Sequence, residues 1–468
     1  MYVCRHFNPP AVPKSATIGP NNSGTLQATA PPTMAVLLIV ILFIFNLASA
    51  SAERKQVTAL PGFNGVLPFS LETGYVSVDE ENGAELFYYF IESEGDPGSD
   101  PVLLWLTGGD RCTVFSGLVY EIGPVKFIIE PYNGSLPQLR YNPYSWTKAA
   151  SILFVDSPVG AGFSFSRNPK GYDVGDVSSS LQLVTFLAKW FTDHPSYNTN
   201  PLYIGGDSYA GKVVPFLAQK ITEEIEAGSR PTLNLKGYLV GNPRTGENID
   251  YDARVPYAHG VGIISDQLYE LLGQVYRAHI LYDSCILVSH GPNKDTANRV
   301  ILKEEAGLGL LKNPPPRPPL GCVTYGNYLS YFWANSGIIR DALGIKKGTV
   351  DEWVRCHSED LPYSHDVKSS IAYHYNVTSK GYRTLVYSGD HDAVVPFLGT
   401  QTWVRSLNFS IVDGWRAWHL DGQSAGFTIT YSNNMTFATV KGGGHTAPEF
   451  QPERCLAMFK RWILNTPL

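Results

Sequence analysis

Short, almost entirely apolar runs recur along this chain, and segments with helical spacing separate them. The runs lie at residues 101–106, 151–155, 202–205, 235–240 and 383–387. A strand without polar alternation is buried on both faces, as in a mainly parallel sheet that helices cover. Residues 177–191 and 212–227 have the spacing of such helices. We therefore predict an α/β fold with a mainly parallel central sheet flanked by helices.

Composition excludes several classes of protein. The chain has 468 residues, of which 44% are hydrophobic and 17% charged, and this is the composition of a globular protein. The net charge is −6 and no long basic run occurs, so we expect no nucleic-acid partner. No zinc-type spacing of His and Cys and no phosphate-binding glycine loop is present, so we expect no metal and no cofactor.

The N-terminus divides into two segments. Residues 1–33 are rich in Pro, Ser, Thr and Asn, and we expect a disordered or unused extension there. Residues 34–52 have an apolar core followed by small residues, which predicts a secretory signal peptide cleaved near Ala50 or Ala52. A membrane anchor is the alternative, but the core is short for a span of about 20 residues. We expect no stable membrane span after cleavage, and export to the extracellular space or the vacuole.

Cysteines and sequons agree with export. Possible glycosylation sites are Asn133, Asn376, Asn408 and Asn434. Five cysteines follow the signal peptide: Cys112, Cys285, Cys322, Cys356 and Cys455. An odd number predicts one free thiol in an exported protein. The helical apolar spacing around Cys455 makes it the expected buried free thiol.

The middle of the chain differs from the rest. Residues from about 245 to 375 are helical in places, contain three of the cysteines and include a proline-rich run from Pro314. The alternation of strands and helices resumes only near Gly381. We predict that 53–468 form a single domain and that about 245–375 are a helical cap insertion, a kind of segment that often shapes substrate choice.

The strongest local pattern surrounds Ser208, in Tyr203-Ile-Gly-Gly-Asp-Ser-Tyr-Ala-Gly-Lys. A strand enters a tight turn that exposes the serine, and a helix begins at once. This strand–turn–helix arrangement is typical of a nucleophile elbow, the turn that carries a catalytic serine. Such a serine requires a base and an orienting carboxylate. His445 follows a strand and three glycines, and Asp390 and Asp392 both follow the strand at 383–387. The order serine, acid, histidine is that of a catalytic triad with either aspartate.

Six separated segments, in this order, carry a family resemblance. They are Trp105-Leu-Thr-Gly-Gly, Asp156-Ser-Pro-Val-Gly-Ala-Gly-Phe-Ser, Gly206-Asp-Ser-Tyr-Ala-Gly-Lys, Gly241-Asn-Pro, Gly389-Asp-His-Asp and Gly442-Gly-Gly-His-Thr-Ala-Pro. From about Gly62 to its end the chain resembles the serine carboxypeptidase family. The resemblance implies the α/β-hydrolase fold, with Ser208 as nucleophile, His445 as base and Asp392 as acid.

The resemblance also implies further contacts. It implies an oxyanion hole formed by the N–H groups of Gly109 and Tyr209. It pairs Cys112 with Cys356 and Cys285 with Cys322, which leaves Cys455 free.

Two positions point to one branch of the family. Carboxypeptidases of this family hold the peptide carboxylate with Asn before the Gly-Gly and Glu before the serine, whereas this chain has Thr107 and Asp207. It looks more like the plant serine carboxypeptidase-like acyltransferases, which move an acyl group from a glucose ester to an alcohol. We therefore expect Thr107, Gly108 and Asp207 to contact a small acyl ester and an alcohol acceptor. The alternative is a carboxypeptidase that binds a peptide C-terminus.

A third hypothesis is a catalytically impaired relative. Where the family has Pro-Gly-Cys, this chain has Asp110-Arg-Cys. If the glycine position needs a positive φ, Arg111 strains the loop by roughly 1–2 kcal/mol. Asp110 would also place a negative charge beside the oxyanion, opposing the charge that develops there.

Overall fold

The computed structural model describes residues 54–271, 279–281, 314–357 and 360–468. The predicted extension at 1–33 and the predicted signal peptide at 34–52 both lie outside the described residues, which begin at Arg54. Within these ranges no helix has both the length and the hydropathy needed to cross a membrane.

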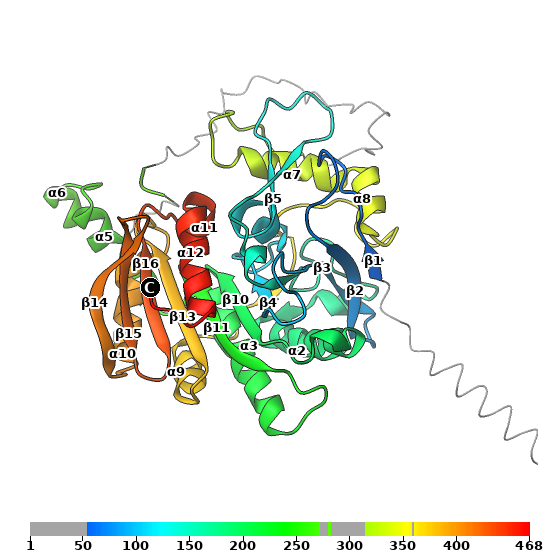
Figure 1. Cartoon of the computed structure of the whole chain (residues 1–468). Helices are drawn as coiled ribbons and strands as arrows, with labels where there is room; N and C mark the ends of the chain where they lie inside the picture. The colour runs from blue at the N-terminus through cyan, green and yellow to red at the C-terminus, as the bar shows by residue number, and fades with distance from the viewer. Residues whose placement is uncertain (1–53, 272–278, 282–313, 358–359) are drawn as a thin grey trace, which may run out of the picture. The chain divides into compact units, whose positions relative to one another are not determined.

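One large sheet organises the described chain, and Figure 1 shows its strands side by side from β14 to β1. In sheet order the strands are β1 (Arg54–Gln56), β2 (Leu71–Asp79), β3 (Ala84–Ile91), β7 (Ser151–Val155), β4 (Val102–Leu106), β10 (Leu202–Asp207), β11 (Leu235–Gly241), β13 (Arg383–Gly389), β16 (Met435–Val440), β15 (Gln423–Tyr431) and β14 (Ile411–Leu420). The short β8 (Phe165–Ser166) pairs with β3.

The centre of the sheet is parallel and its two sides are antiparallel. Every pair from β7 through β4, β10, β11 and β13 to β16 is parallel. The pairs β1–β2, β2–β3 and β3–β7 on one side, and β16–β15 and β15–β14 on the other, are antiparallel. This topology, with helices on both faces, confirms the predicted α/β-hydrolase fold.

Helices on opposite faces explain why the central strands have no polar alternation. On β4, Leu103 and Trp105 belong to one hydrophobic core, whereas Leu104 and its alternate neighbours belong to the other. One core includes residues of α7 (Tyr325–Asn335) and α12 (Pro452–Ile463). The second includes residues of α2 (Asp176–Asp193), α3 (Ala210–Glu226), α9 (Ile371–Ser379) and α10 (Phe397–Ser406).

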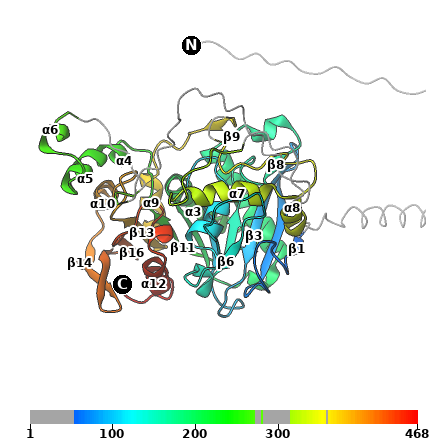
Figure 2. The ribbon, with the colours of Figure 1, turned by 90° about the horizontal axis from the view of Figure 1, so that it is seen from above.

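The middle section contributes helices at two separate places. α4 (Ile249–Asp252) packs against α10 and leads to α5 (Arg254–Gly260) and α6 (Asp266–Tyr269). α7 packs against α8 (Gly337–Leu343) and β5 (Val125–Phe127). Figure 2 shows α5 and α6 at the opposite side of the sheet from α8. A cap spanning about 245–375 stays a prediction, because residues 272–278 and 282–313 lie outside the described ranges.

Short elements complete the described fold. They are β6 (Leu139–Tyr141), β9 (Val174–Gly175), β12 (Tyr363–Ser364), α11 (Ala447–Phe450) and the helical turns Gly117–Glu121, Trp146–Lys148, Pro169–Tyr172 and Pro195–Tyr197.

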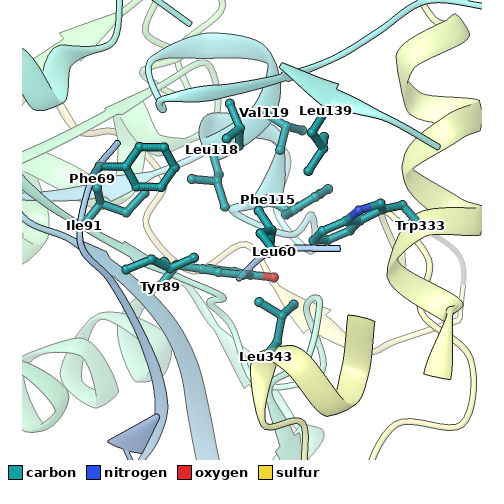
Figure 3. A pocket seen from close by; sticks show the side chains of 12 residues that line it. Leu60, Phe69, Tyr89, Ile91, Phe115, Leu118, Val119, Leu139, Trp333 and Leu343 are labelled. Atoms are coloured by element: carbon teal, nitrogen blue, oxygen red, sulfur yellow. The ribbon is translucent and has the colours of Figure 1, made fainter. Parts of the chain in front are cut away.

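The core beneath α7 and α8 is tightly packed. Figure 3 shows Phe115, Trp333 and Leu343 converging with Tyr89 from β3 on an apolar cavity. Its volume of ≈ 10 Å³ leaves no room for a ligand. This cavity is therefore a gap in the packing of the core and not a ligand site.

Two tryptophans test this packing. Trp190 on α2 is 0% exposed and lies against Phe90 and His194, whereas Trp415 on β14 is 43% exposed. Trp190→Ala should lower the free energy of unfolding by about 3–5 kcal/mol, because a large cavity opens in the core. Trp415→Ala should cost clearly less in the same urea titration. Equal costs would contradict the burial of α2 against the sheet.

Candidate active site

The turn between β10 and α3 presents Ser208. β10 ends at Asp207 and α3 begins at Ala210, and Ser208 between them has φ 53°, a conformation rare for a residue with a side chain. The Ser208 N–H donates to the Gly241 carbonyl at 2.9 Å, which holds the turn against β11. A Cβ on Gly108 would lie 2.6 Å from the Ser208 Cβ, so only glycine allows this approach.

A continuous chain of hydrogen bonds joins Ser208, His445 and Asp392. The Ser208 Oγ lies 2.7 Å from His445 Nε2, and His445 Nδ1 lies 2.8 Å from Asp392 Oδ2. Because the Asp392 carboxylate accepts, Nδ1 donates to it and Nε2 is left to accept from the serine hydroxyl. This arrangement can draw a proton from Ser208 as the serine attacks a carbonyl.

Asp392 and not Asp390 faces the histidine. Asp392 is 0% exposed and accepts further hydrogen bonds from the backbone N–H groups of Val394 at 2.7 Å and Val395 at 3.1 Å. Asp390 instead accepts from the Gly442 N–H at 2.7 Å. The carboxylate that the family resemblance selected is therefore the one that orients His445.

Asn242 completes the support of Asp392, and our sequence analysis did not assign it a role. Its side-chain amide donates to Asp392 Oδ2 at 2.8 Å, and its oxygen accepts from the Gly389 N–H at 3.1 Å. Asn242 lies at the end of β11 with φ 42°. Asn242 lies in Gly241-Asn-Pro, one of the six segments that carry the family resemblance. Its contact with Asp392 could not be read from the sequence, because it depends on the pairing of β11 with β13.

The N–H groups of Gly109 and Tyr209 lie beside the serine. Both residues line the same cavity as Ser208 and His445. In the described part of the chain, neither N–H donates to a protein acceptor. Gly109 has φ 86° and approaches Cys112, whose disulfide to Cys356 fixes the loop. Two free donors beside a nucleophile can bind the oxygen of a tetrahedral intermediate.

The loop after Gly109 lacks the strain that our sequence analysis considered. Arg111 does not have a positive φ, so its side chain fits without that cost. Asp110 is not an isolated charge, since its carboxylate lies 3.3 Å from Arg111 Nε and 2.6 Å from His365 Nε2. The negative charge of Asp110 is therefore balanced within the loop.

The cavity beside Ser208 has a volume of ≈ 290 Å³, enough for part of a small substrate. Its lining includes Ser208, His445, Gly109, Tyr209, Arg244 and Arg254. Nucleophile, base and free N–H donors thus share one space with two arginines. Among the described residues no cluster of His, Cys, Asp and Glu is suited to a metal ion.

Comparison with known proteins decides the family. The serine carboxypeptidase family model matches residues 61–465. The chain belongs to the serine carboxypeptidase family. Serine carboxypeptidase-like 19 of Arabidopsis thaliana is 43% identical, over 92% of this chain and 98% of that relative. Serine carboxypeptidase-like 7 of the same plant is 46% identical, with the same coverage.

A solved structure agrees with the fold. A prohormone-processing carboxypeptidase from Saccharomyces cerevisiae superposes with a TM-score of 0.64 and covers 85% of this chain and 92% of its own. At 19% identity this likeness concerns the fold alone. In the sheet of this chain, Ser208 follows β10, Asp392 follows β13 and His445 follows β16, and β11 lies between β10 and β13.

Thr107 and Gly108 each donate a hydrogen bond to a buried acid. The Thr107 hydroxyl donates to Glu121 at 3.0 Å, and the Gly108 N–H donates to Asp207 Oδ1 at 2.8 Å. Burial raises the pKa of Glu121 to about 7, against the lowering effect of its hydrogen bonds from Trp105 and Thr107. Burial, and then the charge of Glu121, raise the pKa of Asp207 well above its usual range. These acids form a buried cluster next to Ser208.

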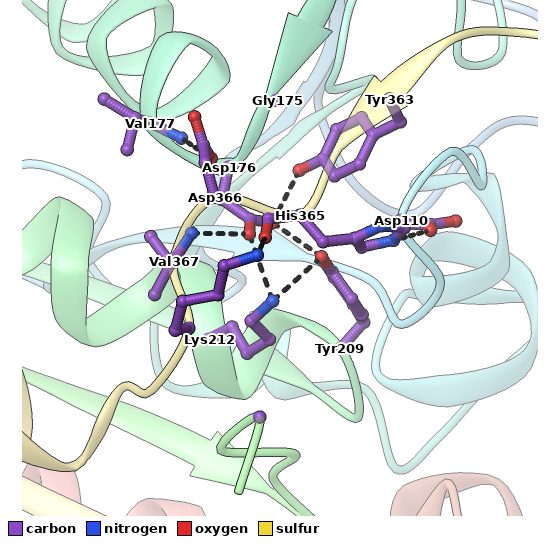
Figure 4. A network of polar contacts seen from close by, with 12 residues as sticks. Asp110, Gly175, Asp176, Val177, Tyr209, Lys212, Tyr363, His365, Asp366 and Val367 are labelled. Carbon is purple, nitrogen blue, oxygen red and sulfur yellow. Dashed lines mark hydrogen bonds and ion pairs between the residues drawn. The ribbon is translucent and has the colours of Figure 1, made fainter.

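A buried ion pair supports Tyr209 from behind, as Figure 4 shows. Asp176 accepts from the Tyr209 hydroxyl at 2.6 Å, from Lys212 Nζ at 3.0 Å and from the Tyr363 hydroxyl at 3.0 Å. The side chains of Asp176 and Lys212 are 0% and 6% exposed. This network ties α2 to the start of α3, and nothing local in the sequence indicated the pairing.

The remaining predicted positions have mixed outcomes. Cys112 and Cys356 form a disulfide and Cys455 is a buried free thiol, as predicted. The predicted Cys285–Cys322 pair cannot be followed, because Cys285 lies outside the described residues. All four sequon asparagines are exposed; their glycosylation stays a prediction. These residues are Asn133, Asn376, Asn408 and Asn434.

Glu121 predicts a pH dependence of stability. Its pKa of about 7 in the fold exceeds the ordinary 4.5, so the folded chain holds its proton over this interval while the unfolded chain loses it. Stability from this group is therefore full below pH 4.5 and is lost as the pH rises through about 7. Glu121→Gln should flatten the decline of unfolding free energy between these values, measured by urea titration. The exposed Glu81→Gln should leave the slope unchanged; a slope equally steep in both would contradict the assignment.

The ion pair behind Tyr209 predicts a large loss of stability. Asp176→Asn should cost about 3–5 kcal/mol, because Lys212 is left buried and unpaired. Adding Lys212→Met should restore part of the loss. Asp413→Asn, which breaks the exposed pair with Arg416, should cost at most about 1 kcal/mol. Thermal and urea unfolding of all four proteins measure this, and equal losses at the two aspartates would refute it.

Proposed function

We propose that this chain is an acyltransferase that works through an acyl-enzyme on Ser208 and moves an acyl group from a glucose ester to an alcohol. The observation that carries the proposal is the hydrogen-bonded chain of Ser208, His445 and Asp392 beside two free N–H groups. We assign Ser208 as nucleophile, His445 as base, Asp392 as the acid that orients it, and Gly109 and Tyr209 as the oxyanion hole.

The reaction has two balanced halves. Ser208 Oγ attacks the ester carbonyl carbon and His445 takes its proton; the ester C–O bond then breaks, and glucose leaves with that proton. In the second half, His445 takes the proton of the acceptor hydroxyl as its oxygen attacks the acyl carbon. The bond to Ser208 breaks, and the serine regains the proton. If water takes the place of the alcohol, the same site hydrolyses the acyl group.

The positions before the Gly-Gly and before the serine favour transfer over peptide cleavage. Thr107 uses its hydroxyl to bond Glu121, and Asp207 uses one oxygen to bond the Gly108 N–H. Neither provides the amide or the longer carboxyl group that carboxypeptidases of the family use for a peptide carboxylate. The two named plant relatives are serine carboxypeptidase-like proteins. We also propose that the chain passes through the secretory pathway, is glycosylated, and works outside the cell or in the vacuole.

The first test is labelling with a fluorophosphonate probe, which needs an activated serine but no knowledge of the substrate. Wild-type protein should label and Ser208→Ala should not. Asp392→Asn should slow labelling by about 10⁴-fold, since the histidine loses its orienting carboxylate. Asp390→Asn is the matched control and should label almost as wild type, because Asp390 bonds Gly442. A folded wild-type protein that does not label would support the impaired relative instead.

Product analysis separates the two enzymes. The protein is given a glucose ester with an alcohol, and separately a blocked dipeptide. We expect ester product from the first mixture and no amino acid from the second. Release of the C-terminal residue without any acyl transfer would refute the acyltransferase proposal and support a carboxypeptidase.

A further inference from the structure

One arginine in the cavity beside Ser208 has no protein acceptor. Arg244 follows β11 and lines this cavity together with Ser208 and His445. Arg244 is half-buried, with its Nε shielded from solvent and without an acceptor, and no ion pair engages its guanidinium within the described ranges. A polar group buried without a hydrogen bond is costly, so this arginine is a candidate for binding a ligand anion.

Aromatic rings hold Arg244 without using its N–H groups. Its guanidinium lies 5.1 Å from the ring centre of Tyr251 and 5.9 Å from that of Tyr209. Arg254 lies over the same Tyr251 ring at 4.6 Å and donates from Nε to the Val394 carbonyl at 2.7 Å. Ring contacts of this kind orient the planar fork and leave its donors available.

The carboxylates that line the cavity already have other partners. Asp250 accepts from the Thr245 hydroxyl at 2.9 Å, from the Thr245 N–H at 2.8 Å and from the Gly246 N–H at 2.9 Å. Asp110 is engaged by Arg111 and His365. Burial raises the pKa of Asp250, and the nearby charge of Arg244 acts in the opposite direction as a smaller effect. Within the described ranges neither carboxylate comes close enough to Arg244 for an ion pair, so the N–H donors of its guanidinium remain available to a group that enters from outside.

We propose that Arg244 binds the carboxylate of the substrate that reacts at Ser208. A planar guanidinium with free donors matches a carboxylate through two parallel hydrogen bonds. The inference rests on the proposed function and narrows it. The donor's own carboxyl group is tied up in the ester and glucose is neutral, so the carboxylate belongs to the acceptor, a hydroxycarboxylic acid. A peptide C-terminus shares this chemistry, and the experiment distinguishes the two sources.

The experiment measures how well free carboxylates protect Ser208 from a fluorophosphonate. The first pair is phenyllactate and phenyllactamide; the second is acetyl-Phe-Ala and its C-terminal amide. For each protein, labelling with the ligand is expressed relative to labelling without it. In wild type, the carboxylate of one pair should protect at a concentration about tenfold or more below its amide, since the charged bond is the stronger.

The variants assign that preference to Arg244. In Arg244→Gln the carboxylate and the amide should protect at similar concentrations. Arg244→Lys keeps the charge without the fork and should retain part of the preference. Arg416→Gln removes the same charge from a distant pair on β14 and should keep the wild-type ratio. A wild-type ratio near one for both pairs, or a ratio that survives in Arg244→Gln, overturns the proposal.

Calorimetry separates this proposal from the proposed function. The same four ligands are titrated into Ser208→Ala protein with and without Arg244→Gln. A carboxylate preference that vanishes with Arg244 supports the inference even if wild type never labels. Labelling without any such preference leaves the catalytic serine in place and refutes the role of Arg244. Preference for phenyllactate points to a hydroxy acid acceptor, and preference for the blocked dipeptide points to a peptide.

Discussion

The candidate active site depends on one strained turn. Ser208 adopts a positive φ, which costs energy for any residue with a side chain. The elements on either side hold the turn in this conformation: β10 is hydrogen bonded to β4 and β11, and α3 begins two residues after Ser208. Because Gly108 has no side chain, the serine can approach the neighbouring loop closely. Without this turn, the serine hydroxyl would not reach His445.

Much of the fold could be predicted, because the central strands are buried on both faces. Such strands are recognisable from their own residues, because an almost unbroken apolar run such as 101–106 predicts a strand that is buried on both faces. The antiparallel hairpin of β14 and β15 was missed for the opposite reason. β14 is largely exposed and contains Asp413, Gly414 and Arg416, so its sequence shows neither an apolar run nor clear alternation.

The candidate site was predictable only where its members have local signatures. Ser208 and His445 each follow a strand and neighbouring glycines, so chain order was enough to nominate them. The choice between Asp390 and Asp392 came from family resemblance, since both follow the same strand. The partners of Asp176 and the isolation of Arg244 depend on contacts between segments far apart in the chain, which no pattern of neighbouring residues records.

The candidate site combines two buried acids next to Ser208 with an arginine in the cavity beside it. The pKa of Glu121 is about 7 and that of Asp207 lies well above its usual range. As the pH falls through about 7, Glu121 takes up a proton and then opposes a developing oxyanion less. Arg244 presents its guanidinium to the same cavity as Ser208 and would attract an anionic acceptor. Protonation of Glu121 would thus remove one negative charge from the neighbourhood of the serine, while the carboxylate of an acceptor would still meet the guanidinium of Arg244.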